Sequence, residues 1–234
     1  MMVDIKNNLK TVENRIAEAA KRVGRNPDEV KLIAVSKTKP VDDINEAIKC
    51  GVTDIGENKV QEVMDKYDAA EPVNWHFIGH LQRNKVKYII DKVTMIHSID
   101  SLRLAMEINN RASAKNIIMD VLIQINPAGE DSKFGISPEE TQLLIEDILK
   151  ECPAINIRGL MCVVPAADNP DDVRVYFKKA KELFDNLGSV ITHERFDMEH
   201  LSMGMTHDFE TAIEEGSTMV RVGTAIFGER NYSK

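Results

Sequence analysis

A lysine stands at the end of a short apolar run near the start of the chain. Leu32 to Val35 are apolar, and Lys37 and Pro40 follow closely. A run this short and rich in branched residues predicts a buried strand, which Pro40 stops because proline cannot donate to a strand ladder. Lys37 is then either a solvated strand end or an amine held in a pocket, where it can attack a carbonyl carbon.

Two later segments carry residues that suit an anion. Ser202 and Gly204 stand in "SMGMTHD", and Gly223 and Thr224 stand in "VRVGTAIFG". Hydroxyl groups and unhindered glycine N–H groups bind phosphate by hydrogen bonding, helped by the dipole of a following helix. Glycines at such places are also ordinary turn residues, so the phosphate hypothesis depends on the two segments coming together.

Arg221 is the one charged residue in the otherwise apolar stretch "TMVRVGTAIF". Alternation along a strand places Arg221 on the same face as Met219 and Gly223. A buried guanidinium must have a partner. The partner is either a core carboxylate, such as Asp120 or Glu199, or an acceptor on a ligand.

The elements that must position these residues alternate along the chain. Apolar positions from Ile5 to Val23 step by three or four and predict a first helix, which "GRNP" ends. Eight short apolar runs then predict strands at 31–36, 54–56, 75–79, 94–99, 117–126, 155–163, 198–204 and 218–223. Amphipathic stretches predict helices at 41–49, 57–69, 81–90, 101–113, 138–150, 170–187 and 207–215. In the stretch at 138–150, Ser137 is the expected N-cap, Pro138 the first position and Glu140 the capping-box residue.

Strict alternation of strand and helix implies parallel strands with right-handed crossovers. Eight such units fit a (β/α)8 TIM-type barrel with an extra N-terminal helix, formed by residues 1–234 as a single domain. An open doubly wound sheet is the alternative. In a barrel, the loops after the strands form the site, so Lys37, Gly223 and Arg221 would meet at one mouth.

A lysine, a phosphate site and a buried arginine around one mouth suggest pyridoxal 5′-phosphate (PLP). Its aldehyde would form a Schiff base with Lys37. Arg221 would oppose the pyridine nitrogen and disfavour protonation of the ring, which makes the cofactor a weaker electron sink than a carboxylate partner does. A Schiff-base aldolase for a phosphorylated sugar is an alternative, because it also uses a barrel lysine.

Six segments resemble one known family, that of the pyridoxal 5′-phosphate homeostasis proteins: "AVSKTKP", "GENKVQE", "WHFIGHLQRNK", "RGLMCV", "LSMGMTHDFETAI" and "GSTMVRVGTAIFG". The family is similar to the barrel domain of alanine racemase standing alone, and the resemblance runs from about Ile5 to the C-terminus. It implies that Lys37 carries PLP as a Schiff base and that Arg221 faces the pyridine nitrogen. It also implies that Ser202, Gly223 and Thr224 hold the phosphate, and that Asn58 and Met203 line the pocket.

The same resemblance implies a PLP carrier or regulator, usually monomeric, that supplies PLP and meets PLP-dependent apo-enzymes transiently. Alanine racemases need a second base, a tyrosine from an additional β-domain. The sequence ends eleven residues after Gly223, and none of its four tyrosines is predicted at a strand tip. We therefore expect no catalytic residue, with a racemase-like enzyme as the alternative. Lys133, after the fifth strand, is either a solvated loop residue or a second amine that neutralises the bound phosphate or takes over the Schiff base during release.

Composition excludes several other classes. A net charge of −8 argues against a nucleic-acid surface, and no stretch approaches the roughly 18 apolar residues of a membrane span. The N-terminal residues lack the apolar core of a signal peptide. Three scattered cysteines predict reduced thiols in a cytoplasmic protein, and the spacing of His97, His193, His200 and His207 fits no metal template.

Overall fold

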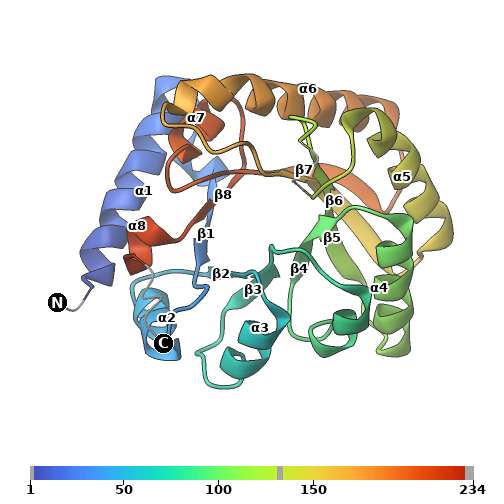
Figure 1. The fold of residues 1–234 in the computed structure, drawn as a ribbon, viewed down its shortest axis with the longest axis horizontal. Helices are drawn as coiled ribbons and strands as arrows, with labels where there is room; N and C mark the ends of the chain where they lie inside the picture. The colour runs from blue at the N-terminus through green and yellow to red at the C-terminus, as the bar shows by residue number, and fades with distance from the viewer. Residues whose placement is uncertain (1–2, 131–133, 230–234) are drawn as a thin grey trace.

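The computed structural model describes residues 3–130 and 134–229, and its strands close into one parallel barrel (Figure 1). Each strand pairs with its neighbours in sequence, and the first strand pairs with the last. The eight strands are β1 (Lys31–Val35), β2 (Asp54–Glu57), β3 (Asn74–Phe77), β4 (Met95–Ile99), β5 (Met119–Ile125), β6 (Ile155–Cys162), β7 (Phe196–Met205) and β8 (Met219–Val222). The predicted (β/α)8 barrel is confirmed, and the open sheet is excluded.

Helices surround the strands in Figure 1. They are α1 (Ile5–Arg22), α2 (Val41–Lys49), α3 (Val60–Lys66), α4 (Leu102–Ala114), α5 (Pro138–Glu151), α6 (Arg174–Val190), α7 (Phe209–Glu214) and α8 (Thr224–Phe227). Three 3-10 helices, η1 (Pro27–Glu29), η2 (Arg83–Tyr88) and η3 (Pro170–Val173), join them. None of the helices in the described ranges is long and apolar enough to cross a membrane.

The extra helix α1 packs on the outside of the barrel beside α7 and α8. The predicted stripe is buried from Ile5 through Leu9, Val12 and Ile16 to Ala19, but its last member, Val23, lies just past the helix and is exposed. The Asp4 side chain accepts a hydrogen bond from the Asn7 N–H and caps the start of the helix. The first helix therefore covers the outside of the β8–α8 connection, where the sequence places its phosphate motif.

Two apolar layers hold the barrel together. The larger layer lies between the strands and the helices, where Phe77, Phe177, Phe209 and Phe227 are all fully buried. A smaller cluster of Met95, Leu122, Met161 and Met219 is separate from it. Because these four come from β4, β5, β6 and β8, we assign this cluster to the inward face of the strands. Inward positions next to these methionines on β4 and β8 carry His97 and Arg221 instead.

Some predicted elements differ in detail. The stretch at 81–90, predicted as a helix, forms the short 3-10 helix η2, in which the Ile89 N–H bonds to the Val86 carbonyl. The stretch at 170–187 divides into η3 and α6. Ser137 and Pro138 begin α5 as predicted, but the Ser137 hydroxyl bonds to the Glu140 carboxylate at 2.6 Å instead of capping a backbone N–H.

Gly159 marks an irregularity between β6 and β7, where the strand register shifts. Its φ is +142°, and a Cβ at this position would lie 1.8 Å from the His200 carbonyl oxygen. No side chain fits at such a distance from backbone, so the register of β7 depends on this glycine.

We predict that Gly159→Ala destabilises the protein by at least about 3 kcal/mol, because a backbone segment must move to admit the methyl group. Gly188→Ala is the matched control, since its Cβ would meet only the Met198 side chain at 3.4 Å inside α6. There alanine should be neutral or stabilising by up to about 1 kcal/mol. Urea unfolding of both variants measures the difference, and equal midpoints would contradict the role given to Gly159.

Candidate functional site

A cavity of about 420 Å³ opens at the C-terminal ends of the strands. Its walls come from the tips of β1, β2, β3, β6, β7 and β8, as expected for a site in a parallel barrel. Of the seven residues predicted to bind a ligand, five line this cavity: Lys37, Asn58, Arg221, Gly223 and Thr224.

Lys37 stands on a strained turn directly after β1. Thr38, the next residue, has a φ of +66°, which is rare and costly for a β-branched residue. The Thr38 N–H donates a hydrogen bond of 2.6 Å to the Glu62 carboxylate, and this bond helps to fix the turn. Lys37 itself is half-buried and lines the cavity, so its amine lies in a pocket and not at a fully solvated strand end.

A buried ionic cluster lies behind this turn. Lys66, from α3, donates to the Glu57 carboxylate at 2.7 Å, to Glu62 at 2.8 Å and to the Ser36 carbonyl at 3.0 Å. The Ser36 hydroxyl also donates to Glu57 at 2.6 Å. Glu57 and Ser36 are fully buried, and Glu62 is partly exposed, so the cluster ties the end of β1 to β2 and α3 from its buried side.

The two carboxylates of the cluster shift in opposite directions. Burial raises the pKa of Glu57, although Lys66 and Ser36 oppose the shift. Burial also disfavours ionisation of Glu62, but hydrogen bonds from Lys66 and the Thr38 N–H outweigh it and lower the pKa of Glu62. Glu62 therefore stays an anion that can hold the strained N–H of Thr38.

Arg221 lies in the wall of the cavity and is 5% exposed. Its guanidinium donates from Nη1 to the Ser202 hydroxyl at 2.8 Å and from Nη2 to the Cys162 carbonyl at 2.9 Å. In the described residues no carboxylate oxygen lies within 4.0 Å of it, so the expected alternative of an ion pair with Asp120 or Glu199 is wrong. Burial lowers the pKa of Arg221, although the nearby Cys162 and Asp208 oppose the shift, and the guanidinium stays charged in the cavity wall.

The edge between β7 and β8 supplies the anion-binding groups. Gly223 precedes the short helix α8, which begins at Thr224. The first N–H groups of a helix have no acceptor within it, so this end can receive an anion. The Gly223 N–H donates to the Thr206 hydroxyl at 3.4 Å, which brings the loops after β7 and β8 together.

The remaining two predicted residues lie away from the cavity. Ser202 is fully buried, and its hydroxyl contacts Arg221 and the ring of His97. Met203 is fully buried in the apolar layer outside the strands. Three residues that sequence reasoning missed line the cavity instead: Lys39, Thr206 and His207. Thr206 and His207 belong to the quoted segment "SMGMTHD", and their position after the seventh strand is the signal that could have identified them.

Lys39 differs from Lys37 in its partners. The Lys39 amine donates to the carbonyl oxygens of Phe227 and Glu229, and so joins the loop after β1 to the end of α8. Lys133, the other amine considered near the mouth, lies outside the described residues.

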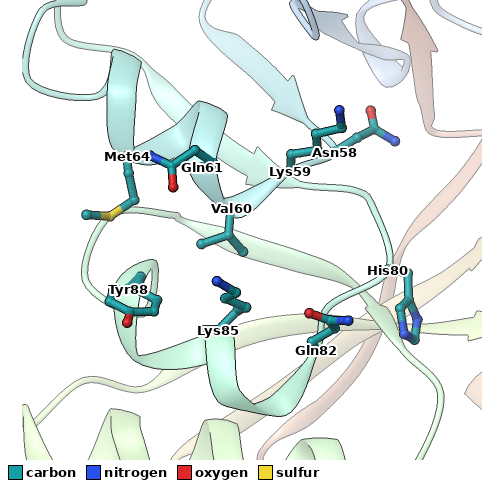
Figure 2. A pocket seen from close by; sticks show the side chains of 9 residues that line it. All are labelled: Asn58, Lys59, Val60, Gln61, Met64, His80, Gln82, Lys85 and Tyr88. Atoms are coloured by element: carbon teal, nitrogen blue, oxygen red, sulfur yellow. The ribbon is translucent and has the colours of Figure 1, made fainter.

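Asn58 belongs to two neighbouring hollows. Its Oδ1 atom is buried and has no hydrogen-bond partner within the described ranges, so a ligand donor can satisfy it. Figure 2 shows the second hollow, a groove of about 450 Å³ between α3 and η2 that Lys59, Lys85 and Tyr88 help to line. Although this groove is slightly larger, it contains neither Lys37 nor Arg221, so the reactive groups belong to the mouth cavity.

Comparison with known proteins identifies the relatives of this chain. Residues 7–231 match the family model described as the alanine racemase N-terminal domain. The pyridoxal phosphate homeostasis protein of Aquifex aeolicus (strain VF5) is 49% identical over 226 residues, which cover 96% of this chain and 97% of that protein.

Solved structures agree with this relationship. A crystal structure of a protein from Bifidobacterium adolescentis matches with a TM-score of 0.87 at 37% identity, covering 95% of this chain and 94% of that one. The structure of PipY from Synechococcus elongatus PCC7942 with PLP bound matches with a TM-score of 0.82 at 29% identity, covering 96% of this chain and all of that one (100%).

We predict that Lys66→Met destabilises the protein by about 3–5 kcal/mol, because it leaves Glu57 buried without its cation. Lys181→Met is the matched control, since Lys181 pairs with Asp185 on the exposed face of α6 and such pairs contribute less than about 1 kcal/mol. Adding Glu57→Gln to Lys66→Met should recover part of the loss. Chemical unfolding measures all three variants, and a small effect of Lys66→Met alone would contradict the cluster's role.

Proposed function

The chain belongs to the pyridoxal phosphate homeostasis protein family, and from that premise we propose that it binds PLP in the mouth cavity, with Lys37 as the attachment point. When bound, PLP supplies an aldehyde that forms a Schiff base with a primary amine. The observation that carries the proposal is that Lys37, Arg221 and the Gly223–Thr224 helix start line one cavity. Its volume of about 420 Å³ falls in the range of small-molecule sites.

Each side of the cavity suits one part of PLP. The Thr206 hydroxyl and the first N–H groups of α8 offer hydrogen bonds to the phosphate. The Arg221 guanidinium offers a donor to the pyridine nitrogen, and as a cation it disfavours protonation of the ring. Asn58 offers a buried amide oxygen that lacks a partner among the described residues. The cavity thus offers Thr206 and the start of α8 for the phosphate, Arg221 for the ring and Lys37 for the aldehyde.

The residues behind the cavity prepare the lysine. The hydrogen bond from Thr38 to Glu62 and the ionic cluster around Lys66 hold the turn that carries Lys37. We propose that Lys37 is positioned for attachment before the cofactor arrives.

We further propose that the protein stores and supplies PLP as a monomer, meeting PLP-dependent apo-enzymes transiently, and does not turn over a substrate. No tyrosine lies among the described residues that line the cavity, so the second base that a racemase uses has no counterpart there. We therefore propose that Lys37 acts in binding, without a tyrosine base across the cavity.

Attachment to Lys37 can be tested on the purified protein with added PLP. Wild-type protein should develop a visible absorption band that borohydride removes, and peptide mass spectrometry should then find the reduced adduct on Lys37. Lys37→Ala should lack the band. Lys59→Ala, which changes a lysine of the neighbouring groove, should keep it. An adduct on Lys39, or an unchanged band in Lys37→Ala, would overturn the assignment.

The absence of turnover is a separate prediction. PLP-loaded protein incubated with L-alanine should form D-alanine no faster than its Lys37→Ala variant with the same added PLP, because no tyrosine is among the described residues that line the cavity. Chiral chromatography over hours measures the product. Lys37-dependent inversion over many turnovers would favour the racemase-like alternative.

A further inference from the structure

Five polar side chains cross the inside of the barrel from the start of β2 to the mouth cavity. Asp54 Oδ1 lies 2.8 Å from His76 Nε2, and His76 Nδ1 lies 2.9 Å from His97 Nε2. His97 Nδ1 lies 3.2 Å from the Ser202 hydroxyl, which accepts from Arg221 at 2.8 Å. The links join β2, β3, β4, β7 and β8, so they run across the barrel and not along one strand.

Every member of this chain is buried. Asp54 is 2% exposed, His76 3% and Arg221 5%, while His97 and Ser202 are fully buried. The structure offers no other use for them, since the described residues contain no group of three metal-ligating side chains arranged for an ion. Buried polar groups cost free energy unless they bond to one another, so a continuous chain of this length needs a reason.

The direction of each hydrogen bond follows from Asp54. Its pKa is lowered to about 2; burial opposes the shift, but hydrogen bonds from His76 and Thr53 outweigh it, so it is a carboxylate that only accepts. The Thr53 hydroxyl and the Asn74 amide also donate to it, at 2.6 and 3.3 Å, and the Lys31 amine lies 3.6 Å away. His76 must therefore carry its proton on Nε2.

The remaining bonds then have one consistent polarity. If His76 carries only this one proton, its Nδ1 accepts, so His97 donates from Nε2. Burial, together with the neighbouring His76 ring and the charge of Arg221, lowers the pKa of His97 well below its ordinary value, so His97 is neutral and accepts at Nδ1. Ser202 then donates to His97, and its oxygen accepts from Arg221. All donors point from the mouth toward Asp54 with no conflict.

We propose that Asp54, His76, His97 and Ser202 form a positioning chain that fixes the Arg221 guanidinium against the cofactor ring. This inference rests on the proposed function for the ring, but the chain itself exists without cofactor. It gives Ser202 a role through Arg221, in place of direct contact with the phosphate. It also makes the end of the barrel opposite the cavity part of the binding site, although that end ordinarily serves stability alone.

The polarity of the chain can be measured on cofactor-free protein by nitrogen-15 NMR of the histidine rings. His76 and His97 should both be neutral with the proton on Nε2. Asp54→Ala should move the ring signals of His97, which it does not touch. Asp120→Ala is the matched control, because Asp120 accepts from Asn156 at 3.0 Å at the start of β5, just as Asp54 accepts from Asn74. A proton on His97 Nδ1, or equal effects of both variants, would overturn the proposal.

Binding of PLP and of pyridoxal, which lacks the phosphate, separates the two possible roles of Ser202. Ser202→Ala and Asp54→Ala should weaken both ligands by the same factor, about 3–10-fold for one lost positioning hydrogen bond. Thr206→Val should weaken PLP far more than pyridoxal. Loss of PLP binding alone in Ser202→Ala would mean direct phosphate contact and would overturn the chain's role.

The two experiments also distinguish this inference from the proposed function. If wild-type protein binds neither PLP nor pyridoxal, the proposed function fails, while the ring signals still decide whether the chain has the stated polarity. Ser202→Ala removes one oxygen atom with little change in volume, so it carries the test if Asp54→Ala does not fold.

Discussion

The site depends on the pairing of the first strand with the last. Ile33 lies opposite Arg221 and Ala34 opposite Val222, so closing the barrel places the loop after β1 beside the loop after β8. Gly223 approaches so closely that a Cβ there would lie 3.0 Å from the Val35 carbonyl oxygen. Residues about 185 positions apart in the sequence become neighbours because parallel strands share the same edge.

Barrel closure fixes the strand ends but not the turn that carries Lys37. That turn has an unfavourable backbone angle at Thr38, which persists only because surrounding contacts outweigh it. Glu62 accepts from the strained N–H, and Lys66 holds Glu62 in place. Since removing Lys66 would leave the buried Glu57 without its cation and Glu62 without its partner, the strained turn depends on the cluster. Such an arrangement limits the positions open to Lys37 before any ligand binds.

The sequence was sufficient to predict the architecture and much of the cavity. Eight apolar runs gave all the strands, including the short β2, because each is buried on both faces in a parallel barrel. The positions after the strands gave Lys37, Asn58, Gly223 and Thr224, since those positions define the mouth. Thr206 was not predicted as a binding residue because Ser202 and Thr206 stand close together in one segment. Only the structure shows that Ser202 points into the barrel and that Thr206 lines the cavity. The ionic cluster around Lys66 was not predicted, because a lysine in an amphipathic helix ordinarily points to solvent.

The hydrogen-bond chain inside the barrel had a signal that could be found without a structure. The five residues of this chain all stand in strand segments: Asp54, His76, His97, Ser202 and Arg221. The methionine cluster shows that an inward-facing position of this barrel can hold an apolar side chain. Packing alone would favour an apolar residue at each, because buried polar groups gain little net stability even when paired. What five bonded polar groups provide, and methionine cannot, is direction: the carboxylate at one end fixes a proton on His76 Nε2, and a neutral His76 then orients the bonds that follow. A guanidinium held in this way keeps one orientation toward the cavity, which a cation among flexible apolar side chains would not.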